Sequence, residues 1–572
     1  MNQPRPDPGF PSAPCTASAT PSVSTSGAGR DHGHARPAEV DVLVVGGGIN
    51  GAGIARDISG RGLSVLLCEK DDLAQHTSSS STKLIHGGLR YLEYREFSLV
   101  RKALAEREVL LRSAPHIMWP LRFVMPHDPS MRSAWMIRTG LFLYDHLARR
   151  EVLPGSRTID LRRHATGAPL RPTYTRGFVY SDAWVDDARL VVLNAVDAAA
   201  RGATVLTRTA CTDARRDASS WHATLRQADG SERHIVARAL VNATGPWAAQ
   251  FLAEHVRAAR SKPLRLVKGS HIVVRRLFEH DHAYIFQNPD KRIIFAIPYE
   301  ADFTLIGTTD IEHTGAIGSP RIDDAEVAYL CEQASRYFVR ALAPADVVWS
   351  YSGVRPLLDD EAGDPSAVTR DYALELSLTL PAPPGSSTDA SQGLPGGAGA
   401  EQAAAPLLNV WGGKITTFRK LAEEAGDLLA TSLQARRGAW TARAFLPGGD
   451  LSPWIGAVDR PDSGFARFVD TLARRHPALP AALVHRLARA YGGRAVALLE
   501  GVLGAEVAPG LHEAELHFLH EHEWARRAED VLWRRSKLGL HYDATARAAV
   551  EAWCERHWGS AAGAIVREQA WS

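Results

Sequence analysis

The alternation of apolar and polar residues predicts a strand, turn, helix and strand near the start of the chain. Four apolar residues at 42–45 precede a glycine-rich turn at 46–53, and a helix-compatible run continues to about Gly62. A second apolar run, 65–68, ends at Glu69. This order is that of a dinucleotide-binding βαβ unit. We therefore predict an α/β fold built around a Rossmann-like domain.

The pattern changes further along the chain. Strand-like runs between 264 and 310 predict an antiparallel sheet in a second domain, and helical spacing from about Trp440 onward predicts a C-terminal α-helical domain. The segment 117–147 mixes Trp, Met and Phe with Arg. It fits a core helix pair, which we slightly prefer, or a helix lying in the headgroup layer of a membrane. In the second case Trp135 and Leu141 would face the lipid.

These patterns divide the chain into four parts. Residues 1–38 are rich in Pro, Ser, Thr, Ala and Gly, and we expect a disordered tail. The dinucleotide-binding domain comprises 39–115, 176–262 and 406–432. The substrate domain comprises 116–175 and 263–405, including a flexible insertion of low complexity at 381–405. The helical domain comprises 433–572.

Composition excludes several classes of protein. The chain has 572 residues and a net charge of +2, which does not indicate a nucleic-acid partner. Its five cysteines are dispersed without C-x-x-C spacing, so we expect no disulfide framework, no metal site and a reducing, cytoplasmic location. No apolar run is long enough to cross a membrane, so we expect any membrane contact to be peripheral.

The residue types in the first unit suit an ADP group. Gly46 permits the tight turn, Gly48 allows a pyrophosphate to approach the backbone, and Gly51 lets the helix pack closely. The helix N-terminus directs N–H groups toward phosphate charge. The carboxylate of Glu69 can bind the ribose hydroxyls and would repel a 2′-phosphate. NAD or FAD therefore fits better than NADP.

A hydroxyl-rich loop follows at 74–83. It is well placed to bind pyrophosphate or ribityl oxygens, and a polar linker with a helix cap is an equally good interpretation. The pair Gly87 and Gly88 lets the backbone approach a flat group. His86 and Arg90 would share one face of a helix, or would lie around a turn if the glycines break it.

Seven motifs together resemble one family. The chain resembles the aerobic, FAD-dependent glycerol-3-phosphate dehydrogenases of bacteria, within the D-amino-acid-oxidase-like flavoproteins, from about residue 38 to the C-terminus. The tail and the 381–405 insertion depart from the family pattern. The motifs are GGGINGAG at 46–53, KLIHGGLRY at 83–91, NATGPW at 242–247, KGSH at 268–271, GTTD at 307–310, YSGVRP at 351–356 and GGKITT at 412–417.

The resemblance implies noncovalent FAD, sn-glycerol 3-phosphate as substrate, dihydroxyacetone phosphate as product and a membrane quinone as electron acceptor. It also implies a homodimer bound peripherally to the inner face of the cell membrane. We assign His86 as catalytic base and Arg90 and Arg355 as catalytic phosphate-binding residues. Substrate binding would also involve Tyr91, His271 and Lys414. The cofactor-binding residues would be Gly46, Gly48, Gly51, Glu69, Thr77, Ser78, Ser79, Lys83, Gly87, Gly88, Ala243, Thr244, Gly245, Gly412, Gly413, Lys414 and Thr416.

Two alternatives remain open at this point. A glycerol-3-phosphate oxidase would share the substrate motifs and pass electrons to oxygen, although the long C-terminal helical region favours the quinone enzyme. A flavin-binding redox sensor or scaffold would be no enzyme. For His86, a structural histidine bonded to the backbone is the main alternative to a catalytic base.

Overall fold

The two apolar runs 42–45 and 65–68 become central strands of a parallel sheet in the computed structural model. Strand β1 (Ala38–Val45) pairs in parallel with β2 (Val65–Cys68) and with β10 (Glu232–Asn242). Both faces of β1 are buried, as parallel sheets require. The described residues are 38–128, 132–257, 262–290, 292–358, 371–379 and 403–559. The predicted disordered tail and the core of the predicted insertion therefore lie outside the described residues.

Eight strands of the described residues form this first sheet, with a central order of β17-β18-β10-β1-β2-β7. Strand β9 pairs with β10 and β8 pairs with β9, which adds an antiparallel hairpin to the sheet. The remaining strands are β7 (Thr204–Leu206), β8 (Thr209–Arg216), β9 (Trp221–Gln227), β17 (Tyr372–Thr379) and β18 (Ala403–Gly412).

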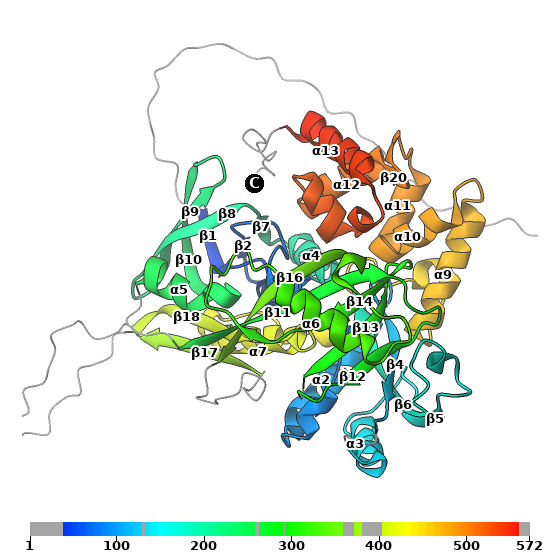
Figure 1. Cartoon of the computed structure of the whole chain (residues 1–572). Coiled ribbons are helices and arrows are strands. Elements are labelled where there is room, and N and C mark those ends of the chain that lie inside the picture. Colours follow the sequence, from blue (N-terminus) through cyan, green and yellow to red (C-terminus); the bar gives the residue numbers. More distant parts are fainter. Residues whose placement is uncertain are drawn as a thin grey trace, which may run out of the picture. The chain divides into compact units, whose positions relative to one another are not determined.

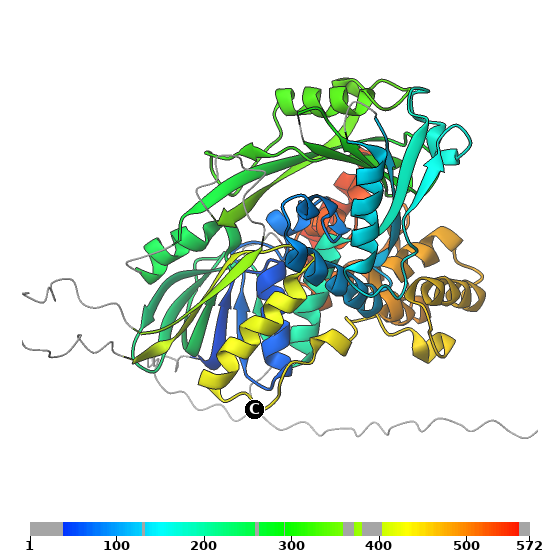
Figure 2. The same ribbon diagram turned by 90° about the horizontal axis from the view of Figure 1, so that it is seen from below.

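Helix α1 (Ile49–Gly60) packs between α4 (Asp187–Ala200) and α7 (Phe418–Leu433), and all three share one core with the sheet. Figure 2 shows α1 in blue beside α7 in yellow. Gly53 permits the close approach of α7, because a Cβ atom there would lie 2.8 Å from the ring of Phe418. The predicted α/β fold is thus confirmed.

Ten strands of the described residues form a second, largely antiparallel sheet (Figure 1). The three predicted runs are β11 (Leu264–Arg275), β13 (Ile293–Tyr299) and β14 (Phe303–Gly307), which pair antiparallel as expected. The other strands are β3 (Leu84–Ile85), β4 (Met118–Pro126), β5 (Arg157–Asp160), β6 (Arg176–Val185), β12 (Ala283–Gln287), β15 (Ile311–Glu312) and β16 (Val347–Leu358). Helices α2 (Phe97–Ser113), α3 (Ala134–His146) and α6 (Asp324–Ser335) complete this part of the chain, whereas α5 (Ala248–Phe251) packs on the first sheet.

Two strands lie in a different sheet from most of the predicted domain in which we placed them. Strand β6 pairs with β4 along its length, so 176–185 is part of the second sheet. Strand β17 pairs with β18, so 372–379 is part of the first sheet. Residues 403–405, placed in the insertion, are already in β18. Periodicity identifies a strand but not its hydrogen-bonding partner, so it does not show which sheet a strand joins. The domain boundaries stay a prediction.

The preferred prediction of a core helix pair at 117–147 is wrong. The first half is β4, a buried strand, and only the second half is helical, as α3. Helix α3 exposes Trp135 (69%) and Phe142 (53%), whereas Leu141 is fully buried. Apolar residues on both sides of a strand resemble a helical stretch in sequence, which accounts for the error.

The last part of the chain that the structure describes, up to residue 559, consists of the predicted helices with a two-stranded sheet among them. Buried ion pairs attach these helices to the first sheet: Asp72 accepts hydrogen bonds from Arg534 (2.6 Å) and Arg535 (2.6 and 2.8 Å). Burial opposes the charge of Asp72, but the two guanidinium groups outweigh it and lower its pKa to about 2. The elements are α8 (Ser452–Ile455), α9 (Pro461–Arg475), α10 (Ala481–Tyr491), α11 (Ala495–Glu500), β19 (Glu506–Ala508), β20 (Leu511–His512), α12 (Glu513–Glu523) and α13 (Ala544–Trp558).

Helix length and polarity decide whether a helix can cross a membrane. Within the described ranges, no helix is both long enough and apolar enough to cross a bilayer. The cysteines of the described residues, Cys68, Cys211, Cys331 and Cys554, are all buried and free, consistent with the predicted absence of disulfides there.

Candidate cofactor and substrate site

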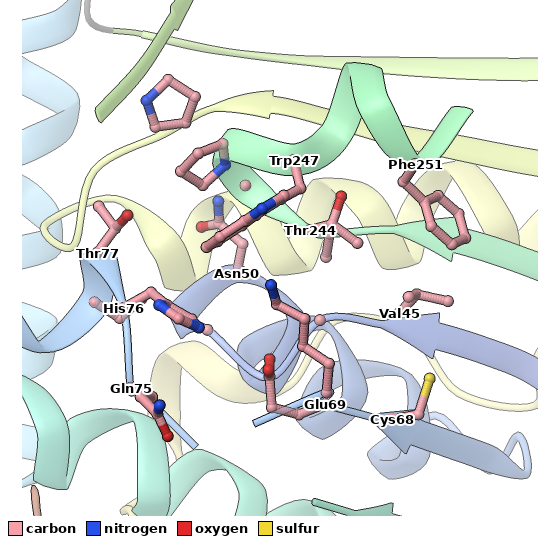
Figure 3. A pocket seen from close by; sticks show the side chains of 18 of the residues that line it. Val45, Asn50, Cys68, Glu69, Gln75, His76, Thr77, Thr244, Trp247 and Phe251 are labelled. Carbon is pink, nitrogen blue, oxygen red and sulfur yellow. The ribbon is translucent and has the colours of Figure 1, made fainter. Parts of the chain in front are cut away.

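The carboxyl ends of β1, β2, β10 and β18 meet at one edge of the first sheet. Ligands of open α/β sheets bind at such an edge. The turns that follow these strands enclose a cavity of about 310 Å³ (Figure 3). It is lined by ten of the predicted cofactor-binding residues: Gly46, Gly48, Glu69, Thr77, Ser78, Ala243, Thr244, Gly245, Gly412 and Gly413.

Glycine is required at two positions of the first turn. Gly46 has φ +112°, and a Cβ atom there would lie 2.5 Å from the carbonyl oxygen of Ala243. A Cβ atom at Gly51 would lie 1.8 Å from the carbonyl oxygen of Gly46. Gly51 does not line the cavity; it lets α1 pack against the turn, which keeps the helix N-terminus at the site.

The carboxylate of Glu69 is held at the end of β2. Its two oxygens accept hydrogen bonds from the backbone N–H groups of Gly47 (2.6 Å) and Asp71 (2.9 Å). Burial raises the pKa of Glu69 above its usual value. Each carboxylate oxygen has further lone pairs, so the group can still accept bonds from ribose hydroxyls.

Aromatic residues that we did not predict form one wall of the cavity. The ring centres of His76 and Trp247 lie 4.8 Å apart, and the amine of Lys70 lies 3.9 Å from the centre of the Trp247 ring. Figure 3 shows His76 and Trp247 among the side chains that line the cavity. Trp247 lies within the NATGPW motif, so a search for flat walls near the glycine turns would have found it.

The cavity's chemistry fits FAD. It offers an acid for ribose, a helix N-terminus for pyrophosphate and aromatic faces for adenine. Asn50 also lines it: its amide nitrogen donates to the carbonyl oxygen of Gly412 (3.1 Å), and its buried Oδ1 atom has no hydrogen-bond partner among the described residues. Such an atom suits a ligand with donor groups.

The hydroxyl loop divides into lining and supporting residues. The Ser78 hydroxyl accepts a hydrogen bond from the Ile49 N–H (2.9 Å), and Thr77 donates to the Val354 carbonyl (2.7 Å). Lys83 is buried and donates to Asp187 (2.7 Å) and to the Ser79 carbonyl (3.0 Å). These contacts show Lys83 fastening the loop to α4. Its contact with the cofactor, like that of Ser79, stays a prediction.

Gly87 and Gly88 have structural reasons to be glycine. The Gly87 N–H donates to the hydroxyl of Tyr144 (2.8 Å), and a Cβ atom at Gly87 would lie 2.5 Å from Leu104. Gly88 has φ +76°, a left-handed conformation, so no regular helix continues through it into the 3-10 helix η2 (Leu89–Leu92). His86 and Arg90 consequently do not share a helix face.

Two distant segments meet beside η2. The His86 N–H donates to the Thr416 hydroxyl (3.3 Å), and the amine of Lys414 lies 3.9 Å from the centre of the Tyr91 ring. The structure thus brings together the predicted residues His86, Tyr91, Lys414 and Thr416. The guanidinium of Arg90 points to Tyr94 and donates to its hydroxyl (3.1 Å).

The second sheet supplies Arg355 and His271. Arg355 forms an ion pair with Asp310 and donates to the Thr308 hydroxyl (3.2 Å). A Cβ atom at Gly269 would lie 2.3 Å from the Arg355 guanidinium, and one at Gly307 would lie 2.2 Å from the His271 ring. The glycines of the KGSH and GTTD motifs therefore make room for these two side chains.

His271 is buried and neutral. Its ring stacks on Tyr351 at 4.7 Å, and its Nε2 atom contacts the Thr82 hydroxyl at 3.0 Å. Burial, followed by the charge of Arg355, lowers the pKa of His271 well below its usual value. A neutral imidazole beside a guanidinium can hold a hydroxyl group without carrying charge.

The described residues contain one group of three side chains with metal-ligand spacing, Glu69, Asp71 and His76. The His76 and Asp71 side chains bind each other (2.7 Å), and Glu69 holds the glycine turn. These bonds explain the group without a metal ion, and the absence of metal stays a prediction.

Comparison with known proteins supports the resemblance. The family model described as FAD dependent oxidoreductase matches residues 41–372, and the one described as C-terminal domain of alpha-glycerophosphate oxidase matches 439–556. A glycerol-3-phosphate dehydrogenase of Pseudomonas aeruginosa is 53% identical over 505 residues, which cover 87% of this chain and 92% of the relative. A D-erythritol 1-phosphate dehydrogenase of Brucella abortus is 49% identical over 525 residues, 91% and 98% of the two chains. The X-ray structure of the glycerol-3-phosphate dehydrogenase from Bacillus halodurans, complexed with FAD, matches with a TM-score of 0.69 and 27% identity over 91% of each chain.

Proposed function

This chain belongs to the family of FAD-dependent oxidoreductases, and from this premise we propose that it oxidises sn-glycerol 3-phosphate to dihydroxyacetone phosphate and passes the electrons to a membrane quinone. The observation that carries the proposal is the 53% identity to a glycerol-3-phosphate dehydrogenase over almost the whole chain. The cavity at the sheet edge, with an acid, a helix N-terminus and aromatic walls, supports FAD as the cofactor.

The substrate phosphate requires cationic side chains. Arg355 is anchored by Asp310 and Thr308, which fixes its guanidinium plane for bidentate contact with phosphate oxygens. Arg90 and Lys414 add positive charge from η2 and from the turn after β18. The bound FAD supplies hydride acceptance at its flavin ring. The protein's part is to hold the substrate C2 hydrogen toward that ring.

The C2 hydroxyl must lose a proton during oxidation. We assign this role to His86, because imidazole titrates near neutral pH and the segment 86–91 lies against the turn at 414–416. His271, which is neutral and buried next to Arg355, is suited to hold a substrate hydroxyl rather than to cycle its charge.

The test is an anaerobic titration of the purified holoenzyme with sn-glycerol 3-phosphate, followed in the visible absorbance of the flavin. Bleaching that a quinone analogue reverses much faster than air would support the proposal. Bleaching reversed mainly by air, with peroxide formed, would instead identify an oxidase, an alternative that the match at 439–556 keeps relevant. Absence of bleaching with this substrate would refute the proposed function.

A second substrate deserves the same titration. The 49% identity to a D-erythritol 1-phosphate dehydrogenase covers 91% of this chain. Both substrates are polyol phosphates, so the same cationic groups would bind the phosphate of either. A kcat/KM for D-erythritol 1-phosphate above that for glycerol 3-phosphate would move the assignment to the four-carbon compound.

We further propose a peripheral location on the inner face of the cell membrane, and a homodimer as the assembly. The exposed apolar residues Trp135, Met136, Phe142 and Leu143 of α3 support membrane contact, because Trp and Phe are typical of helices in the interfacial layer. Tyr94 and Phe97 are also exposed, next to η2. The measurement for the assembly is mass determination by light scattering in detergent.

A further inference from the structure

Four aromatic rings lie in a row between the second sheet and the C-terminal helices. The ring of His271 stacks on Tyr351, with the ring centres 4.7 Å apart and the ring planes at 17°. The ring centre of Trp349 lies 5.1 Å from that of Tyr351, and Trp349 in turn stacks on Trp533 at 4.8 Å and 19°. The row therefore runs from a predicted substrate-binding residue to a residue of the C-terminal helices.

The register of the second sheet aligns three of these rings. His271 of β11 is directly opposite Tyr351 of β16, so the two side chains lie on one face of the sheet. Trp349 precedes Tyr351 by two residues, and residues two apart in a strand face the same side. The fourth ring, that of Trp533, comes from outside the sheet.

Trp533 is anchored in the C-terminal part of the chain. It lies in the π-helix η9 (Asp530–Arg535) and packs against the core of the C-terminal helices. A Cβ atom at Gly539 would lie 2.7 Å from the Trp533 ring, so glycine there makes room for the indole. The buried ion pairs to Asp72 come from the same π-helix. Trp533 is therefore a fixed support for the ring of Trp349.

Tyr351 connects this support to the substrate side. Its hydroxyl donates to the carbonyl oxygen of Ser81 (2.8 Å), next to Thr82 in the chain. The Thr82 hydroxyl contacts Nε2 of His271 at 3.0 Å. The His271 ring is thus held by Tyr351 on one face and by Thr82 at one edge. Its buried Nδ1 atom has no hydrogen-bond partner among the described residues, which leaves this atom for a ligand.

We propose that Trp533 is a positioning residue for the oxidation, which acts through Trp349 and Tyr351 to fix the ring of His271 against the substrate hydroxyl. The inference rests on the proposed function, in which His271 holds that hydroxyl. It gives the C-terminal helices an influence on a site that the two sheets form. Misplacement of a reacting group by about 1 Å can cost about 100-fold in rate, so loss of the support should be measurable.

Three variants test the support. Trp533→Leu removes the ring, and Trp533→Phe keeps an aromatic face for Trp349. Trp558→Leu is the matched control, because Trp558 is a buried tryptophan of the same helices and stacks on His520 at 4.7 Å. Both leucine variants lose one ring stack and should melt at a lower temperature than the wild type. Stoichiometric FAD in all three would verify that the cofactor cavity is intact.

The first measurement is stopped-flow reduction of the bound flavin by sn-glycerol 3-phosphate. We expect the limiting rate to fall about tenfold in Trp533→Leu, to return to within about twofold of the wild-type rate in Trp533→Phe, and to be normal in Trp558→Leu. A double-mutant cycle with His271→Asn separates positioning from general loosening. If Trp533 acts through His271, the double variant should be no slower than His271→Asn alone. Multiplied losses, or a normal rate in Trp533→Leu, would overturn the proposal.

The second measurement does not depend on the substrate. Crystal structures of the wild-type, Trp533→Leu and Trp558→Leu holoenzymes should show the His271 ring turned away from Tyr351 in Trp533→Leu alone. The same ring positions in all three would contradict the proposal. If sn-glycerol 3-phosphate fails to reduce the wild-type flavin, the proposed function fails, and the crystal structures still decide whether Trp533 holds His271 in place.

Discussion

The cofactor cavity at the edge of the first sheet and the cavity beside α3 are built in different ways. Backbone turns after β1, β10 and β18 contribute glycines to the lining of the first, and a Cβ atom at Gly46 would lie 2.5 Å from the carbonyl oxygen of Ala243. Side chains from η2, α3 and the second sheet form the second, around a glycine with open space beside it. A site made of backbone leaves a glycine signature in the sequence, whereas a site made of side chains leaves only a scattered apolar pattern.

The largest effect is expected from a substitution in the glycine turn that supports the cofactor cavity. Gly51→Leu would drive a side chain into the carbonyl of Gly46, because even its Cβ atom would lie 1.8 Å away. We expect loss of all bound flavin, measured by absorbance after purification, together with a lower melting temperature.

Gly438→Ala is the matched control for this prediction. It replaces a glycine whose added Cβ atom meets nothing within 4 Å, so flavin content should stay at the wild-type level. Stoichiometric flavin in Gly51→Leu would contradict the requirement for glycine.

The next largest effect separates substrate binding from cofactor binding. Arg355→Gln keeps the cofactor cavity intact but removes a charge held by Asp310 and Thr308. Loss of a charged hydrogen-bonding partner costs roughly 3 kcal/mol, or roughly 100-fold in kcat/KM for glycerol 3-phosphate. Flavin content should be unchanged. The control is Arg336→Gln, because Arg336 is an exposed arginine near the end of α6. A similar loss of kcat/KM in both variants would show that Arg355 has no specific role in binding the substrate.

A smaller effect separates the two histidines by pH. The pKa of His271 lies well below its usual value because of burial and the Arg355 charge, so His271 stays neutral above about pH 6.5, the ordinary imidazole value. A base that becomes protonated as pH falls produces a decline of kcat/KM on the acid side. We expect His86→Gln to abolish this decline and His271→Asn to retain it at a lower rate. If the acid-side decline of kcat/KM disappeared in His271→Asn but not in His86→Gln, His271 would be the base and His86 would hold the substrate hydroxyl.

The sequence predicted the parts of the fold that depend on local spacing. The first βαβ unit, the antiparallel runs of β11, β13 and β14 and the C-terminal helices follow from periodicity, and they were found. The sheet to which β6 and β17 belong depends on long-range pairing, which periodicity does not encode. The helix pair expected at 117–147 failed for a related reason, because a buried strand and a buried helix face are similarly apolar.

The candidate site divides along the same line. Gly46, Glu69 and Gly245 were predicted from turns and acids at strand ends, and the structure gathers them in one cavity. Lys83 and Gly87 come from another motif, KLIHGGLRY at 83–91, and they contact Asp187 and Tyr144. A motif identifies a segment with a constrained structure, and it does not show which members face the ligand.

The smallest effect tests the exposed surface of α3 without touching either cavity. Phe142 is 53% exposed and does not line the cavity beside α3, unlike Trp135. Phe142→Glu would remove part of the 1.5–3 kcal/mol that burial of a Phe side chain contributes, about 1.4 kcal/mol, or about tenfold in vesicle affinity.

Co-sedimentation with vesicles of anionic lipid measures this affinity. Val339→Glu is the control because Val339 is also exposed but lies in the segment that follows α6. Reoxidation by a short-chain quinone in detergent should be normal in Phe142→Glu, because this reaction does not require binding to a membrane. Equal vesicle binding by both variants and the wild type would move the membrane surface away from α3. Normal membrane binding with slow quinone reduction in Phe142→Glu would instead make the α3 surface part of the acceptor site.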